Sequence, residues 1–168
     1  HVTSLPSFFL LAKIPLFVRL STMLHFHIIT LFPESIEPYL SCSMLGRAQL
    51  KSGKPRKGEK AKFKVSFYNP RDYTDDKWAR VDRLPYGGGP GMVLAAEPLL
   101  KAVQAATKGK KAEIFFFSPA GKQFDQAMVK QLASQTNKRN SQTVVKNIEF
   151  ICGRYEGVDA RVEKILKA

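Results

Sequence analysis

The stretch IEFICGRYEGVDARVEKILKA, residues 148–168, contains the pattern that decides the fold. Its apolar run indicates a buried strand over residues 148–152, which is followed at once by the glycine-bounded turn GRYEG. Residues 159–168 are then predicted to form a helix capped by Asp159. A strand that passes through a short glycine turn into a helix is typical of a parallel sheet covered by helices.

The same order of elements recurs upstream. The apolar strand predicted over residues 112–117 ends in the turn SPAG and is followed by a helix over 124–135, with Asp125 as its N-cap. A helix is also predicted over residues 97–109, with Pro98 in its first turn and Gly109 just past its end. Further strands are predicted over 25–33 and 63–67, and helical spacing is seen in 35–53. We therefore expect an α/β fold, a parallel sheet with helices on both faces.

Composition limits the class of protein. The chain has 168 residues, 44% of them hydrophobic, which suits one globular domain. Its formal net charge of +13 favours a nucleic acid as partner, then an acidic membrane surface, and leaves open a merely soluble basic protein. Residues 1–22 are apolar but too interrupted by charges and prolines for a membrane span, and they lack a signal-peptide pattern. We expect them to be an extension outside the fold and expect no membrane association.

Cysteine and histidine give no metal pattern. Cys42 and Cys152 lie 110 positions apart, without the spacing of a zinc site or of a disulfide framework. We expect both to be buried free thiols in a reducing cytoplasm. His25 and His27 alternate along a predicted strand with no third ligand near them, so packing is the favoured interpretation and no metal site is predicted.

The two glycine turns predict a binding pocket. In an open parallel sheet, ligands bind outside the carboxyl ends of the strands, where turns 118–121 and 153–157 are expected to meet. Exposed backbone N–H and C=O groups there could bind a planar heterocycle, which indicates a nucleoside-sized pocket. The alternative is that both turns need glycine for structural reasons alone, and that Arg154 and Glu156 form only a surface ion pair.

A second glycine run, PYGGGPGMV at residues 85–93, follows a polar loop. It matches neither the phosphate-binding P-loop nor the dinucleotide fingerprint. Backbone that approaches a flat ligand such as a flipped base fits it better. The segment before it mixes basic and aromatic residues, which suits RNA, although Trp78 could instead lie in the core. These residues are Arg71, Tyr73, Lys77, Trp78, Arg80 and Arg83.

Five strings occur in a distinctive order: ITLFPE, GRA, NPRDYTDDKWARVDRLPYGGGPGM, SPAGKQFDQ and CGRYEGVDARV. Over residues 26–164 they closely resemble the bacterial tRNA (guanine-N1)-methyltransferases, which modify the guanine 3′ of the anticodon. This resemblance implies a SPOUT-type, trefoil-knotted fold, S-adenosylmethionine as methyl donor, tRNA as partner, a homodimer in the full-length form and a cytoplasmic location. It leaves a magnesium requirement open.

The resemblance also implies roles for individual residues. The cofactor would be bound by Phe117, Ser118, Pro119, Ala120 and Gly121 and by Gly153, Arg154, Tyr155, Glu156 and Gly157. The target guanine would be received by Asp82, Tyr86, Gly87, Gly88, Gly89 and Gly91. The glycines would then be required because a base lies directly on the backbone, where a Cβ would intrude.

Three features depart from the family. Ala120 stands where glutamine is common, and Arg83 stands where the family is usually acidic. The sequence stops at Ala168, before the family's third cofactor loop, its linker with the aspartate thought to act as general base, and its C-terminal tRNA-binding domain. We therefore expect residues 23–168 to form a partial SPOUT domain with an incomplete knot, no catalytic base of its own and no activity in isolation.

Two rival functions are kept beside this one. A non-catalytic RNA-binding module would use the positive charge and the basic aromatic loop without binding a donor. A different SPOUT RNA methyltransferase, acting on ribose, is disfavoured by the PYGGGPGM loop, because ribose methylation does not need a guanine-receiving segment.

Overall fold

The computed structural model describes residues 23–51, 53–54, 57–119, 121–136 and 147–166. Within them, parallel strands form a sheet in the order β2-β1-β6-β5: β2 (Phe63–Tyr68), β1 (Leu24–Ile29), β6 (Asn147–Cys152) and β5 (Glu113–Phe117). Strand β6 enters between β1 and β5, with Phe26 opposite Ile148 and Phe115 opposite Phe150. The predicted parallel sheet is confirmed, and the expectation for residues 1–22 lies outside the described residues.

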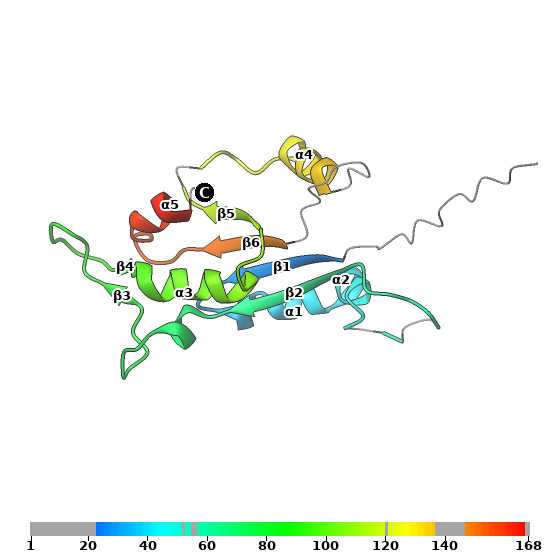
Figure 1. The fold of residues 1–168 in the computed structure, drawn as a ribbon, viewed down its shortest axis with the longest axis horizontal. Coiled ribbons are helices and arrows are strands. Elements are labelled where there is room, and N and C mark those ends of the chain that lie inside the picture. Colours follow the sequence, from blue (N-terminus) through cyan, green and yellow to red (C-terminus); the bar gives the residue numbers. More distant parts are fainter. Residues whose placement is uncertain (1–22, 52, 55–56, 120, 137–146, 167–168) are drawn as a thin grey trace, which may run out of the picture.

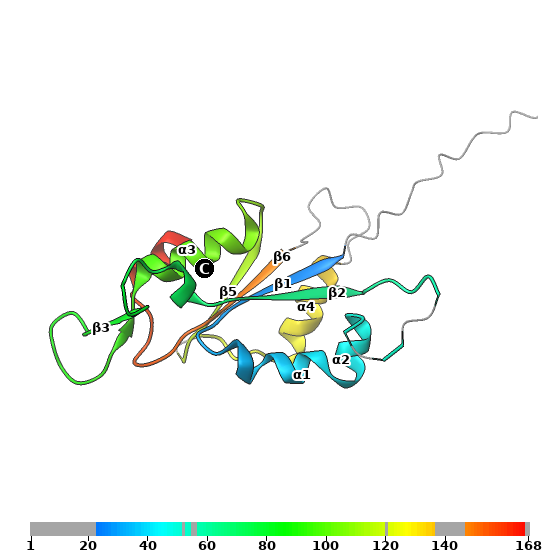
Figure 2. The ribbon, with the colours of Figure 1, turned by 90° about the horizontal axis from the view of Figure 1, so that it is seen from below.

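Helices cover both faces of this sheet (Figure 2). Helices α3 (Ala96–Thr107) and α5 (Arg161–Leu166) lie on one face, whereas α1 (Glu37–Ser41), α2 (Ser43–Ala48) and α4 (Gln126–Thr136) lie on the other. The helical spacing seen in residues 35–53 corresponds to two short helices, α1 and α2, rather than to one continuous helix. Cys42 is extended and Ser43 has a φ of +50°, which interrupts the helix, and the Cys42 thiol is exposed rather than buried.

Helix α3 forms the centre of the core. Its buried positions recur at helical spacing, and Leu99 and Ala102 are fully buried against Ile29 of β1 and Ile151 of β6. Burial of a leucine side chain stabilises a fold by about 1.5–3 kcal/mol. Pro98 lies in the first turn of α3, and Gly109 follows its end with a φ of +77°, as predicted.

The face under α3 also holds a buried polar group. His27 and Glu149 are register partners on β1 and β6, and Glu149 is only 1% exposed. His27 is in hydrogen-bond distance of the Tyr68 hydroxyl and of Asn147 Oδ1, both at 3.3 Å. Neither Glu149 oxygen has a hydrogen-bond partner among the described residues. Burial therefore raises the pKa of Glu149 to about 7, while the nearby Thr107 side chain opposes this shift.

The loop that contains the glycine run projects from the end of the sheet to which the arrowheads of β5 and β6 point (Figure 1). It includes a short antiparallel pair that the sequence pattern does not reveal, β3 (Asp82–Arg83) with β4 (Val93–Leu94). A 3-10 turn, η2 (Pro70–Tyr73), precedes this pair, and another, η1 (Pro33–Ser35), follows β1. The hairpin and α5 therefore lie together at the carboxyl end of the sheet.

In the part of the chain that the structure describes, no helix has the length and apolar character needed to cross a membrane.

Candidate active site

The two predicted glycine turns meet at the carboxyl ends of β5 and β6, as the parallel topology requires. They line a cavity of about 420 Å³ together with the segment that leads into α5. Among the predicted cofactor residues, those that line it are Phe117, Ser118, Pro119, Gly153, Arg154, Tyr155, Glu156 and Gly157. The lining also includes residues that the sequence analysis did not select: Phe116, Val158, Asp159, Ala160 and Glu163.

The turn after β5 is held by its own backbone. The Gly121 N–H donates to the Ser118 carbonyl oxygen at 3.0 Å, and a Cβ at Gly121 would lie 3.1 Å from that oxygen. Gly121 therefore closes the turn rather than lining the cavity, and Ala120 lies outside the described residues. Phe117 presents about half of its surface to solvent at the mouth of the cavity.

The turn after β6 is joined to the hairpin by backbone hydrogen bonds. The Glu156 N–H donates to the Met92 oxygen at 3.1 Å, and the Leu94 N–H donates to the Gly157 oxygen at 3.0 Å. Tyr155 forms a bridge with Val93 and has a φ of +61°, a left-handed conformation that an aromatic residue seldom adopts. Such strain persists only where surrounding contacts enforce it, and it gathers at functional sites.

The electrostatics of Tyr155 link this turn to β3. Burial, the hydrogen bond with Asp82 and the negative charge of Asp82 raise the pKa of the Tyr155 hydroxyl, whereas the positive charges of Arg71 and Arg154 oppose the shift. Asp82, predicted to receive the guanine, therefore lies beside Tyr155 in the turn after β6.

Arg154 does not form the surface ion pair with Glu156 that we considered as the alternative. Its guanidinium lies 4.6 Å from the ring centre of Phe32 and 5.5 Å from that of Tyr155. Phe32 was not selected from the sequence, although it is part of the ITLFPE string at the end of β1.

The glycine run adopts the backbone that only glycine tolerates well. Gly87, Gly88, Gly89 and Gly91 have φ values of +90°, +79°, +108° and +99°. A Cβ at any of the first three would meet nothing within 4 Å, so conformation already requires glycine there. At Gly91 a Cβ would lie 2.5 Å from Glu156 Cγ, so this glycine is also required by close approach. The contact of a base with this backbone stays a prediction.

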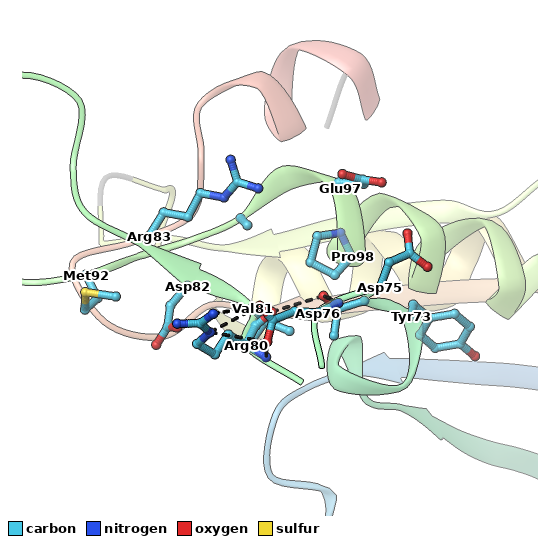
Figure 3. A pocket seen from close by; sticks show the side chains of 12 residues that line it. Tyr73, Asp75, Asp76, Arg80, Val81, Asp82, Arg83, Met92, Glu97 and Pro98 are labelled. Atoms are coloured by element: carbon cyan, nitrogen blue, oxygen red, sulfur yellow. Dashed lines mark hydrogen bonds and ion pairs between the residues drawn. The ribbon is translucent and has the colours of Figure 1, made fainter. Parts of the chain in front are cut away.

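The predicted guanine residues Asp82 and Tyr86 line different hollows. Asp82 lies in a groove of about 530 Å³ between the hairpin and the start of α3, beside Arg83, Met92 and Arg80 (Figure 3). Tyr86 lies in a second hollow of about 550 Å³ between the hairpin, α3 and α5. Tyr86 is 84% exposed, and Arg161 Nη2 donates to its hydroxyl at 3.2 Å. Arg83, Ala95 and Glu97 line both hollows.

The basic aromatic segment is ordered by Asp76. Its carboxylate accepts from the backbone N–H of Trp78 at 2.8 Å and pairs with Arg80 at 3.0 Å. These interactions lower the pKa of Asp76 to about 2, and the hydrogen bond from the Arg80 side chain contributes most to this shift. Trp78 is 73% exposed, so the alternative that it lies in the core is wrong.

Among the described residues, no group of three or more histidine, cysteine or acidic side chains is placed to hold a metal ion.

Comparison with known proteins agrees with this geometry. The family model described as tRNA (Guanine-1)-methyltransferase TrmD matches residues 24–167. The chain belongs to this tRNA (guanine-1)-methyltransferase family. A crystal structure of the family's tRNA (m1G37) methyltransferase from Aquifex aeolicus matches with a TM-score of 0.65 and 32% identity, over 85% of this chain and 56% of that one. The expected α/β methyltransferase fold is thereby confirmed.

Curated members of the tRNA (guanine-1)-methyltransferase family are similar at the sequence level. The tRNA (guanine-N(1)-)-methyltransferase of Pseudoalteromonas atlantica is 41% identical over 82% of this chain and 45% of its own length. That of Caldanaerobacter subterraneus is 39% identical over 84% of this chain and 51% of its own length. The chain thus spans about half the length of these relatives.

Proposed function

We propose that this chain carries the donor-binding and guanine-receiving part of an S-adenosylmethionine-dependent enzyme. The enzyme would methylate N1 of the guanine 3′ of the tRNA anticodon. Two backbone hydrogen bonds carry this proposal, from Glu156 to Met92 and from Leu94 to Gly157. They join the glycine hairpin to the edge of the cavity that the turns after β5 and β6 line. A donor pocket and a base-receiving loop need this juxtaposition, because the reacting atoms must lie about 3–3.5 Å apart.

The cavity suits S-adenosylmethionine. Its volume of about 420 Å³ lies in the range of small-molecule sites, and two strand-end turns supply much of its wall. Backbone groups at Ser118 and over residues 153–157 would hold the adenosine, and Phe117 would cover it. The bound donor supplies a methyl group on a positively charged sulfur.

The chain's own residues would bind and orient the guanine. The open backbone at residues 87–89 would receive its flat face, and Asp82 beside Tyr155 would accept a hydrogen bond from its amino edge. N1 of guanine carries a proton at neutral pH, so methylation also needs a base. We place that base outside the described residues, in the segment that follows the matched region in the family.

The proposal extends to partners. The net charge of +13 suits tRNA, whose phosphates dominate the affinity of basic proteins. By resemblance we expect the full-length protein to be a homodimer whose sites draw on both subunits, and we expect it to act in the cytoplasm. We likewise expect a trefoil knot in the full-length protein and a domain that begins at residue 23, after an extension over residues 1–22.

A chimera tests the proposal. Residues 23–168 are joined to the C-terminal part of the Aquifex aeolicus relative and incubated with labelled S-adenosylmethionine and a tRNA transcript. We expect label on a transcript with guanine 3′ of the anticodon, none on the same transcript with adenine there, and none with the 168-residue chain alone. Label on ribose, or on both transcripts, would contradict the proposal, and RNA binding without donor binding would favour a non-catalytic module.

A further inference from the structure

Two arginines from distant parts of the sequence make cation–π contacts with Phe32. The Arg71 guanidinium lies 5.8 Å from the ring centre of Phe32, and that of Arg154 lies 4.6 Å from it. Arg71 belongs to η2 after β2, Arg154 follows β6, and Phe32 follows β1. Both positive charges also act on the Tyr155 hydroxyl, so the pair lies beside the candidate active site.

These arginines differ from others nearby. Arg80 pairs with Asp76 at 3.0 Å and Arg161 pairs with Asp159 at 2.6 Å. In the part of the chain that the structure describes, neither Arg71 nor Arg154 has an ion-pair partner, and the Arg71 guanidinium donates one hydrogen bond, from Nη1 to the Leu31 carbonyl oxygen at 3.5 Å. Asp82, the carboxylate that acts on Tyr155, is engaged by that hydroxyl.

A cation–π contact with the face of a ring holds a guanidinium in place without engaging its N–H donors. Apart from the long hydrogen bond of Arg71 Nη1 to Leu31, the planar fork of N–H donors stays free to bind an oxyanion. Two like charges held beside one ring repel each other, and an anion bound between them removes that repulsion. The ring therefore prepares a site for a negatively charged oxygen group.

We infer that Arg71 and Arg154, both held over the ring of Phe32, form an anion site beside the donor cavity and take a phosphate of the RNA substrate. This inference rests on the proposed function. The carboxylate of the donor's amino-acid part has the same chemistry and is the other possible source of the anion. Arg154 lines the donor cavity, but Arg71 does not. An anion bound by both arginines therefore lies outside that cavity, and we assign it to the RNA.

The test measures two affinities of the 168-residue chain. Binding of a labelled tRNA anticodon hairpin is followed by fluorescence anisotropy at several salt concentrations, and donor binding is followed by calorimetry. The variants are Arg71→Ala, Arg71→Lys and Arg154→Ala. The matched control is Lys64→Ala, which removes one positive charge from the start of β2, at the opposite end of the sheet.

We expect Arg71→Ala to weaken hairpin binding by about tenfold, because a hydrogen bond to a charged group is lost. The slope of log affinity against log salt should fall in magnitude by about 0.7–0.9, the value of one phosphate contact. Arg154→Ala should lower the slope equally, Arg71→Lys should keep the slope but lose part of the affinity, and Lys64→Ala should change neither. Donor binding should be unchanged by Arg71→Ala.

Other results overturn the inference in distinguishable ways. If Arg71→Ala lowers donor affinity and leaves the salt slope unchanged, the anion is the donor's carboxylate. If the unaltered chain binds hairpin and donor but both arginine variants behave like Lys64→Ala, the anion site does not exist while the proposed function stands. If the unaltered chain binds neither hairpin nor donor, the proposed function itself fails for this part of the protein.

Discussion

Gly91 of the glycine run lies directly against Glu156 in the turn after β6, so closely that a Cβ at Gly91 would be 2.5 Å from Glu156 Cγ. The hydrogen bond from the Glu156 N–H to the Met92 oxygen, at 3.1 Å, fixes this approach. The hairpin and the cavity edge are therefore one packed unit, and a change in either should be felt in the other.

Gly91→Ala should disrupt this unit. It combines a left-handed φ of +99° with the close contact, and it should weaken donor binding by roughly tenfold, a loss of about 1.4 kcal/mol. The control is Gly88→Ala, which also has a left-handed φ, of +79°, but meets nothing within 4 Å. Calorimetric titration with S-adenosylmethionine compares the two, and equal losses would show that the contact is irrelevant. The double variant Gly91→Ala with Glu156→Ala should recover part of the loss.

Tyr86 offers a test of the guanine-receiving loop. Because its ring is exposed and can stack on an unpaired base, Tyr86→Ala should reduce hairpin binding by about 1–3 kcal/mol. Tyr86→Phe keeps the ring and loses only the hydrogen bond from Arg161, so its affinity should stay close to that of the unaltered chain. Anisotropy titration measures both, and equal effects of the two variants would argue against stacking.

Glu149 predicts a pH dependence of stability. Its pKa is raised by burial to about 7 in the fold, so its contribution is favourable below pH 4.5, where it is neutral in both states, and is lost as pH rises through 7. Glu149→Gln should therefore stabilise the fold at pH 8 by about 1–2 kcal/mol relative to its effect at pH 5. The lowered pKa values of His25 and His27 oppose this trend in both proteins, so the difference between them is the quantity to measure. Denaturant unfolding at both pH values tests it, and a difference that does not change with pH would contradict it.

Asp125 should act as the N-cap of α4. Its Oδ1 accepts from the Met128 N–H at 2.8 Å, so Asp125→Ala should lower the free energy of unfolding by about 1 kcal/mol. Asp125→Asn preserves an accepting oxygen and is the control. Thermal unfolding compares the variants, and an equal loss in Asp125→Asn would point to charge rather than capping.

Local patterns predicted much of this molecule. The apolar runs of β5 and β6, the caps at Asp125 and Asp159 and the positions of Pro98 and Gly109 all follow from short-range rules, and they locate the cavity at the strand ends. What could not be predicted depends on tertiary contacts. The bridge from Val93 to Tyr155 joins segments 62 positions apart, and the cation–π contacts of Arg71 and Arg154 with Phe32 require three strands to be in register.

The residues predicted to receive guanine show a second part of the fold that local pattern does not predict. Asp82 and Tyr86 are four positions apart, and the sequence suggested one shared role. The hairpin instead directs Asp82 toward Tyr155 and the groove of Figure 3, while Tyr86 contacts Arg161. A two-residue strand carries too little pattern to reveal such a division beforehand.

The most direct measurement is photocrosslinking of radiolabelled S-adenosylmethionine to the chain, followed by mapping of the labelled peptides. The donor cavity predicts label within residues 117–121 or 153–160, with loss of that label in excess unlabelled donor. Competable label confined to residues 73–83, in the groove of Figure 3, would contradict the assignment of the donor site, as would the absence of any competable label.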